Sequence, residues 1–76
     1  MKAILWSKYH CPYCDQAKML LQQQGYEIEE RKIGDGYTKE ELLEAVPTAR
    51  TVPQIFLENQ YIGGFTELKQ HFSKAA

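Results

Sequence analysis

The sequence YHCPYCDQAK occupies residues 9–18 and contains both cysteines of the chain, Cys11 and Cys14. Three uses would explain such a close pair: a structural disulfide, part of a metal site, or a redox couple. A disulfide stabilises a protein by closing a loop in the unfolded chain, and the gain grows with the length of that loop. Because this loop is almost the shortest possible, the sequence disfavours a structural disulfide.

A metal site within one chain is also disfavoured. Tetrahedral zinc takes four ligands, usually from two cysteine pairs or from one pair and two histidines. The histidines here are His10 and His71, whose spacing does not fit. We therefore expect no metal site within one chain. A cluster shared between two molecules, with one or two thiolates from each, remains an alternative.

The sequence that follows the first cysteine predicts a helix over about residues 12–24. Pro12 is well suited to a first helical turn, where its missing N–H group is not needed, and Gly25 is a natural stop. Apolar residues between them recur at helical spacing, namely Tyr13, Ala17, Leu20 and Leu21.

A redox couple fits this placement of the cysteines. Cys11 lies at the predicted helix start, where free N–H groups and the positive end of the helix dipole favour the thiolate. The thiolate is the nucleophilic form of cysteine. Cys14 lies one turn further along and should be less exposed, so that one thiol attacks and the other resolves. Lys8 adds a nearby positive charge.

The first half of the chain predicts two strands and a second helix. Residues 2–6 are apolar without alternation, which is typical of a short strand buried on both faces and central in a sheet. Residues 26–33 mix apolar and charged side chains, as in an exposed edge strand. Thr38 and Glu41 form a capping-box pattern, and Pro47 ends the helix that follows.

The second half predicts a hairpin and a last helix. Residues 54–58 and 61–63 form the two strands, with a tight turn at Asn59-Gln60. Thr66 is expected to cap a helix that runs to about Ser73. The order is therefore β-α-β-α-β-β-α. A strand–helix–strand crossover is right-handed and parallel, whereas the hairpin is antiparallel. The sequence thus predicts an α/β fold with a four-stranded mixed sheet and three flanking helices.

Length and charge narrow the possible functions. The chain has 76 residues, as expected for a single domain over residues 1–76. Its net charge of −1 lacks the basic excess of a nucleic-acid-binding protein. It has no apolar run of membrane-spanning length and no secretory signal pattern. We expect a monomer in the cytoplasm, a reducing compartment where a close cysteine pair is more often catalytic or metal-binding than structural.

Three segments together resemble the dithiol glutaredoxins of the thioredoxin-fold superfamily. The motif CPYC at residues 11–14 is similar to their active-site motif. The segment TVPQIF at residues 51–56 is similar to the one before their third strand, where the proline is cis, and Gly63-Gly64 resembles their glutathione-recognition turn. The order and spacing of the segments also match. The resemblance covers essentially the whole chain and implies the small bacterial or viral form.

The resemblance implies a role for each matching residue. Cys11 resembles the nucleophile and Cys14 the resolving thiol. The other matches imply a glutathione site formed by Lys8, Tyr13, Arg50, Thr51, Val52, Pro53, Gly63, Gly64, Phe65, Thr66 and Glu67.

Some of these residues would meet particular parts of glutathione. Lys8 would face the glycine carboxylate, and the backbone of Val52 would pair with the cysteinyl part. Thr66 and its amide would receive the γ-glutamyl carboxylate, since a helix N-terminus favours anions. Glu67 stands where the family commonly has aspartate, near the ligand's ammonium group.

The implied activity is reduction of protein disulfides and of glutathione mixed disulfides. Glutathione is the reducing co-substrate, and no metal or organic cofactor is expected. Ribonucleotide reductase is the electron acceptor that the resemblance suggests. Two alternatives remain: a redoxin reduced by thioredoxin reductase, and an iron–sulfur carrier that bridges two chains through glutathione.

Overall fold

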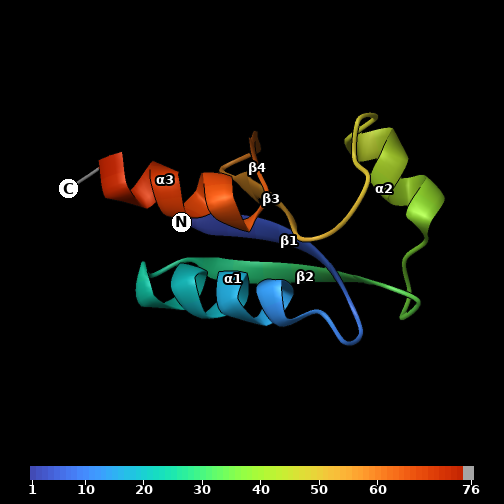
Figure 1. Cartoon of the computed structure of the whole chain (residues 1–76), viewed down its shortest axis with the longest axis horizontal. Coiled ribbons are helices and arrows are strands. Elements are labelled where there is room, and N and C mark those ends of the chain that lie inside the picture. The colour runs from blue at the N-terminus through green and yellow to red at the C-terminus, as the bar shows by residue number, and fades with distance from the viewer. Residues whose placement is uncertain (75–76) are drawn as a thin grey trace.

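The computed structural model describes residues 1–74. Its elements follow the predicted order: β1 (Lys2–Lys8), α1 (Pro12–Gln23), β2 (Glu27–Ile33), α2 (Lys39–Ala45), β3 (Gln54–Leu57), β4 (Gln60–Gly63) and α3 (Phe65–Lys74). Figure 1 shows α1 and α3 running along the strands, while α2 stands apart at the end of the sheet where β1 ends. None of these helices is long and apolar enough to cross a membrane.

The four strands form one mixed sheet in the order β2-β1-β3-β4. β1 is parallel to β2 and antiparallel to β3, and β3 is antiparallel to β4. The prediction of a mixed sheet, with residues 2–6 in a central strand and residues 26–33 at an edge, is therefore confirmed. The parallel crossover through α1 brings the end of β1 back beside the end of β2, where Lys8 pairs with Ile33.

The unbroken apolar run of β1 serves two cores because successive side chains of a strand point to opposite faces. On one face Ala3 and Leu5 pack with residues of β3, α1 and α3. On the other face Trp6 packs with Leu42 and Val46 of the α2 segment and with both cysteines. Both cysteines of the CPYC motif are thus packed into the core at the start of α1.

The second helix begins as predicted. The Thr38 hydroxyl accepts a hydrogen bond from the Glu41 N–H at 3.2 Å, and the Glu41 carboxylate accepts one from the Thr38 N–H at 2.9 Å. The capping box is therefore complete. The helix ends at Ala45, with Val46 as its C-cap, directly before Pro47.

Two predicted boundaries near the end of the chain are wrong by one residue. The tight turn lies at Glu58-Asn59, whose φ values of 50° and 69° place both in the left-handed region, so β4 begins at Gln60. The last helix begins at Phe65, so Thr66 lies within its first turn and is not the cap. Gly64 precedes the helix, and its N–H donates to the Glu67 carboxylate at 2.7 Å. Sequence alone favoured Thr66 because a hydroxyl is a common cap.

Candidate active site

Cys11 is the N-cap of α1, at the position that the sequence predicts. Its backbone is extended, and its carbonyl accepts hydrogen bonds from the N–H groups of Cys14 and Asp15 at 3.1 and 3.2 Å. Its sulfur accepts a further one from the Cys14 N–H at 3.2 Å. A sulfur held at the N-terminus of a helix lies at the positive end of the dipole. The arrangement favours negative charge on the Cys11 sulfur.

The two cysteines form a disulfide, with their Cα atoms 5.3 Å apart. Cys11 is 8% exposed and Cys14 is 3% exposed. The expectation that the second cysteine is the less accessible one is therefore confirmed. In the reduced protein, an incoming disulfide would reach Cys11 first.

A loop from a distant part of the chain lies against this pair. The bond between Val52 and Pro53 is cis, as the resemblance implies. The Val52 carbonyl oxygen lies 3.9 Å from the Cys11 sulfur, although the two residues are 41 positions apart. Backbone groups beside a reactive sulfur are suited to holding an extended peptide substrate.

Two residues that the sequence analysis did not place in the site hold this loop. The Gln54 side-chain amide donates a hydrogen bond to the Thr51 carbonyl at 2.8 Å, and the Tyr61 hydroxyl donates to Gln54 Oε1 at 2.5 Å. Burial, and next the negative charge of Glu67, raises the pKa of Tyr61 above its ordinary value. The hydroxyl therefore stays protonated and keeps donating. The only signal in the sequence was a polar residue, Gln54, within the otherwise apolar segment VPQIF. A buried polar group needs partners, but the sequence does not show which residues these are.

A groove on the α3 side of the loop collects most of the predicted glutathione residues. Its lining residues are Tyr13, Thr51, Val52, Pro53, Gln54, Tyr61, Gly64, Phe65, Thr66 and Glu67. Eight of these ten were predicted, and Gln54 and Tyr61 were not. The rings of Tyr13 and Phe65 lie 5.9 Å apart, so that α1 and α3 meet at the groove.

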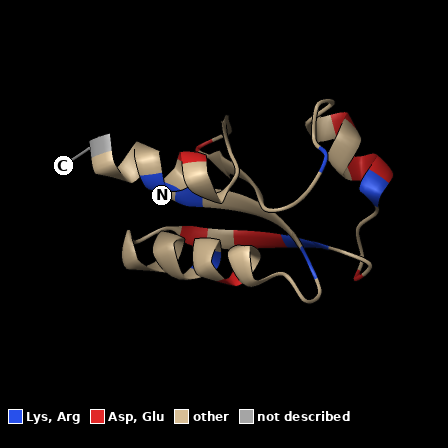
Figure 2. Cartoon of the chain, viewed as in Figure 1, with Lys and Arg blue, Asp and Glu red and all other residues tan. Residues whose placement is uncertain are grey.

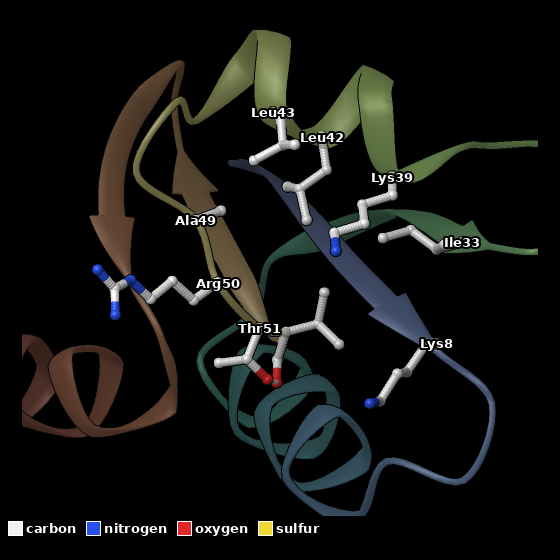
Figure 3. Close-up of a pocket in the computed structure, with 9 residues that line it drawn as sticks. Lys8, Ile33, Lys39, Leu42, Leu43, Ala49, Arg50 and Thr51 are labelled. Carbon is white, nitrogen blue, oxygen red and sulfur yellow. Dashed lines mark hydrogen bonds between the residues drawn. The ribbon is translucent and has the colours of Figure 1, made fainter.

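The remaining predicted residues lie elsewhere. Lys8 and Arg50 line a second cavity, on the α2 side of the loop, which shares Thr51 and Val52 with the groove. Figure 3 shows the Lys8 side chain pointing toward Thr51, whereas Arg50 extends away from Lys8. Gly63 is buried beside the groove and is not part of its lining. The predicted set is therefore divided between two hollows that meet at Thr51 and Val52.

The glycine pair is required by close packing. Gly63 has φ of +124°, and a Cβ added there would lie 2.8 Å from Glu67 Cγ. A Cβ on Gly64 would lie 3.3 Å from both the Pro53 carbonyl oxygen and Glu67 Oε1. Side chains at these positions would press on the groove wall.

A polar cluster ties α1 to the sheet and was also not predicted. Glu30 of β2 accepts a hydrogen bond from the buried Ser7 hydroxyl at 2.7 Å and pairs with Lys18 of α1 at 2.6 Å. Partial burial alone would raise the pKa of Glu30. The hydrogen bonds from Lys18 and Ser7 and the charges of Lys18 and Lys32 outweigh this, so its pKa lies below the ordinary value. The mixture of apolar and charged side chains in the edge strand does not reveal such a pairing.

Comparison with known proteins agrees with this geometry. The sequence profile of the glutaredoxin family matches residues 3–62. Glutaredoxin 3 of Escherichia coli K12 is 39% identical over 64 residues, which are 84% of this chain and 77% of that protein. Glutaredoxin 1 of the same organism is 35% identical over 74 residues, which are 88% of this chain and 87% of that protein. The chain belongs to the glutaredoxin family.

The solved structures support the same assignment. Glutaredoxin 1 from Francisella tularensis, in complex with cacodylate, superposes with a TM-score of 0.81 at 31% identity, covering 97% of this chain and 94% of that one. A buckwheat glutaredoxin–glutathione complex gives 0.82 at 25% identity, covering 96% and 69%. The predicted thioredoxin fold is confirmed, and this glutaredoxin is a thiol–disulfide oxidoreductase.

Proposed function

We propose that this glutaredoxin uses glutathione to reduce protein disulfides and glutathione mixed disulfides. The observation that carries the proposal is the position of Cys11 at the N-cap of α1, with its sulfur facing the Val52 carbonyl at 3.9 Å. The helix start favours the thiolate. The loop beside it offers backbone groups that align a substrate for in-line attack.

The reaction conserves electrons between the two sulfur pairs. The Cys11 thiolate attacks one sulfur of the substrate disulfide and releases the other as a thiolate. The Cys14 thiolate then attacks Cys11, releases the target as a thiol, and leaves the Cys11–Cys14 disulfide. Two glutathione molecules reduce this disulfide in two successive exchanges and become oxidised glutathione. Glutathione mixed disulfides need only Cys11, because a second glutathione resolves the adduct.

Glutathione would lie across the two hollows. Its cysteinyl part would pair with the Val52 backbone, its glycine carboxylate would face Lys8, and its γ-glutamyl end would lie near Gly64, Thr66 and Glu67. The buckwheat relative is a complex with glutathione. In this chain the Glu67 carboxylate already accepts from the Gly64 N–H. It would therefore meet the ligand's ammonium group from that fixed position.

The remaining expectations complete the proposal. The protein would act as a monomer in the cytoplasm, without a metal or organic cofactor, and ribonucleotide reductase is one acceptor to test. The decisive experiment follows reduction of a glutathionylated peptide with glutathione, glutathione reductase and NADPH, and includes Cys11→Ser as the inactive control. Turnover that requires thioredoxin reductase instead would favour the other redoxin. An iron–sulfur chromophore on a dimer after anaerobic purification, without turnover, would favour the carrier.

A further inference from the structure

The cavity on the α2 side of Val52 has apolar and basic lining residues that glutathione would leave without contacts. It has a volume of about 210 Å³. Its apolar lining consists of Ile33, Leu42, Leu43, Ala49 and Val52, and its basic residues are Lys8, Lys39 and Arg50. No acidic side chain lines it.

The basic residues of this cavity have no acidic partner in the described part of the chain. The ion pairs over residues 1–74 involve Lys18, Arg31 and Lys32. In Figure 3 the Lys39 side chain extends from α2 toward the side chain of Leu42, whereas the Lys8 side chain extends from the end of β1 away from Lys39 and toward Thr51. Figure 2 shows a basic position at the start of α2 and acidic positions further along it. A carboxylate entering the cavity would meet uncompensated positive charge.

Glutathione leaves part of this cavity empty. Its residue after the cysteine is glycine, which has a carboxylate for Lys8 but no side chain to cover Leu43. Lys39, at the start of α2, would remain without a counter-charge. An apolar lining next to a free lysine is suited to a longer chain with an apolar side chain and a second acid.

We propose that this cavity binds the target protein's chain on the C-terminal side of its reactive cysteine, and that it selects an apolar residue followed by an acidic one. The direction of the chain rests on the proposed function, because the glycine of glutathione also follows its cysteine. The apolar side chain covers Leu43 and its neighbours, and the acid pairs with Lys39. Lys39 and Leu43 are thus specificity-determining residues for protein substrates.

The test uses disulfide-linked homodimers of short peptides, so that either sulfur attacked belongs to the peptide. One peptide is acetyl-Gly-Cys-Leu-Glu-amide. A second carries glutamine in place of the glutamate, and a third has the reversed order Glu-Leu-Cys-Gly. The fully reduced protein is mixed with each dimer, and one turnover is followed by oxidation of the Cys11–Cys14 pair. The protein's own two thiols supply both electrons, so failure of glutathione turnover would not affect this result.

We expect the Cys-Leu-Glu dimer to react faster than the glutamine and reversed dimers at low salt, by about 1.4- to 5-fold, the range of an exposed ion pair. Lys39→Glu should abolish this preference, and Lys39→Arg should keep it. Lys2 lies at the end of β1 opposite to Lys8 and does not line the cavity. Lys2→Glu therefore makes the same charge change outside the cavity and should leave the preference intact. Leu43→Ala should slow the Cys-Leu-Glu dimer and leave a Cys-Gly-Glu dimer unchanged.

Two results would overturn the proposal. Equal rates for all dimers with the wild-type protein would show that the cavity does not select the substrate. A preference lost equally in Lys39→Glu and Lys2→Glu would show that overall charge, not this cavity, sets the rate. Alkylation of Cys11 by iodoacetamide should proceed alike in all variants, which confirms that each one is folded and reactive.

Discussion

On the α3 side of Val52, the groove is built from backbone groups, glycines and polar side chains that are already bonded to one another. Glu67 accepts from the Gly64 N–H, and Tyr61 donates to Gln54. On the α2 side, the cavity has apolar walls and lysines without acidic partners among residues 1–74. The first hollow is preorganised, whereas the second keeps its charges available for a ligand.

This difference suggests a division of labour between the two hollows. Preorganised donors and acceptors suit one small ligand of fixed shape, because little ordering is needed on binding. Apolar surface with unpaired charge tolerates different side chains and discriminates by charge. The α3 side would therefore recognise the γ-glutamyl end of glutathione, and the part of the α2 side beyond Lys8 would distinguish protein targets. Both depend on the same sulfur, Cys11.

The largest effect should come from the cysteines, on which both hollows depend. Cys11→Ser should abolish all activity, because the remaining thiol, Cys14, is only 3% exposed and cannot reach an incoming disulfide. Cys14→Ser should retain reduction of glutathione mixed disulfides and lose most reduction of protein disulfides, since only the second reaction needs an internal resolving thiol. Parallel assays with a glutathionylated peptide and a disulfide-bonded protein measure this. An equal loss in both assays for the Cys14 variant would contradict the assigned roles.

The next effect should separate the two hollows. Gly64→Val places a side chain 3.3 Å or less from the Pro53 carbonyl and Glu67. It should raise the KM for glutathione about tenfold, the loss of roughly 1.4 kcal/mol of binding. Iodoacetamide labelling of Cys11 should not change, and neither should the preference for the Cys-Leu-Glu dimer. Lys39→Glu should abolish that preference and should raise the KM for glutathione less than Gly64→Val does, because the glycine carboxylate of glutathione would face Lys8 and not Lys39. If each variant impaired both properties alike, the two hollows would not be separate.

A smaller effect is expected from the hydrogen bonds that hold the shared loop. Tyr61→Phe removes the donor to Gln54 and leaves the ring in place. One hydrogen bond contributes about 0.5–1.5 kcal/mol, so the KM for glutathione should rise about two- to tenfold with little change in kcat. Tyr26→Phe, whose ring packs on Phe72 away from the groove, is the matched control. A fall in kcat at constant KM would mean that Tyr61 acts on the chemistry and not on the loop.

The sequence revealed those features that depend on local pattern. The helix start at Cys11 follows from Pro12 and helical periodicity, and the central position of β1 follows from its unbroken apolar run. Resemblance supplied the cis bond at Pro53. Periodicity could not reveal the Tyr61–Gln54–Thr51 chain or the Glu30 cluster, because each joins residues by tertiary contact. The division of Lys8 from the groove residues likewise appears only when β1 and α2 are placed in space.

The smallest effect should come from Glu30, which holds α1 to the sheet through Lys18 and so supports the position of Cys11. Its pKa in the folded protein is lowered from about 4.5. Its stabilisation is therefore present above the unfolded-state pKa and is lost as the pH falls through the lower folded value. Glu30→Gln should reduce the free energy of unfolding at pH 7 by about 1 kcal/mol or less, since the pair is partly exposed.

Urea unfolding at pH 7 and at pH 3 measures this difference, which should shrink at the lower pH. Glu27→Gln lies on the same strand, is exposed, and forms no ion pair among residues 1–74, so it is the matched control. In Glu30→Gln, glutathione turnover and the rate with the Cys-Leu-Glu dimer should change by the same factor, because α1 positions Cys11, on which both hollows depend. If Glu30→Gln lowered only glutathione turnover or only the rate with the Cys-Leu-Glu dimer, the Glu30 cluster would orient one hollow and not the whole of α1.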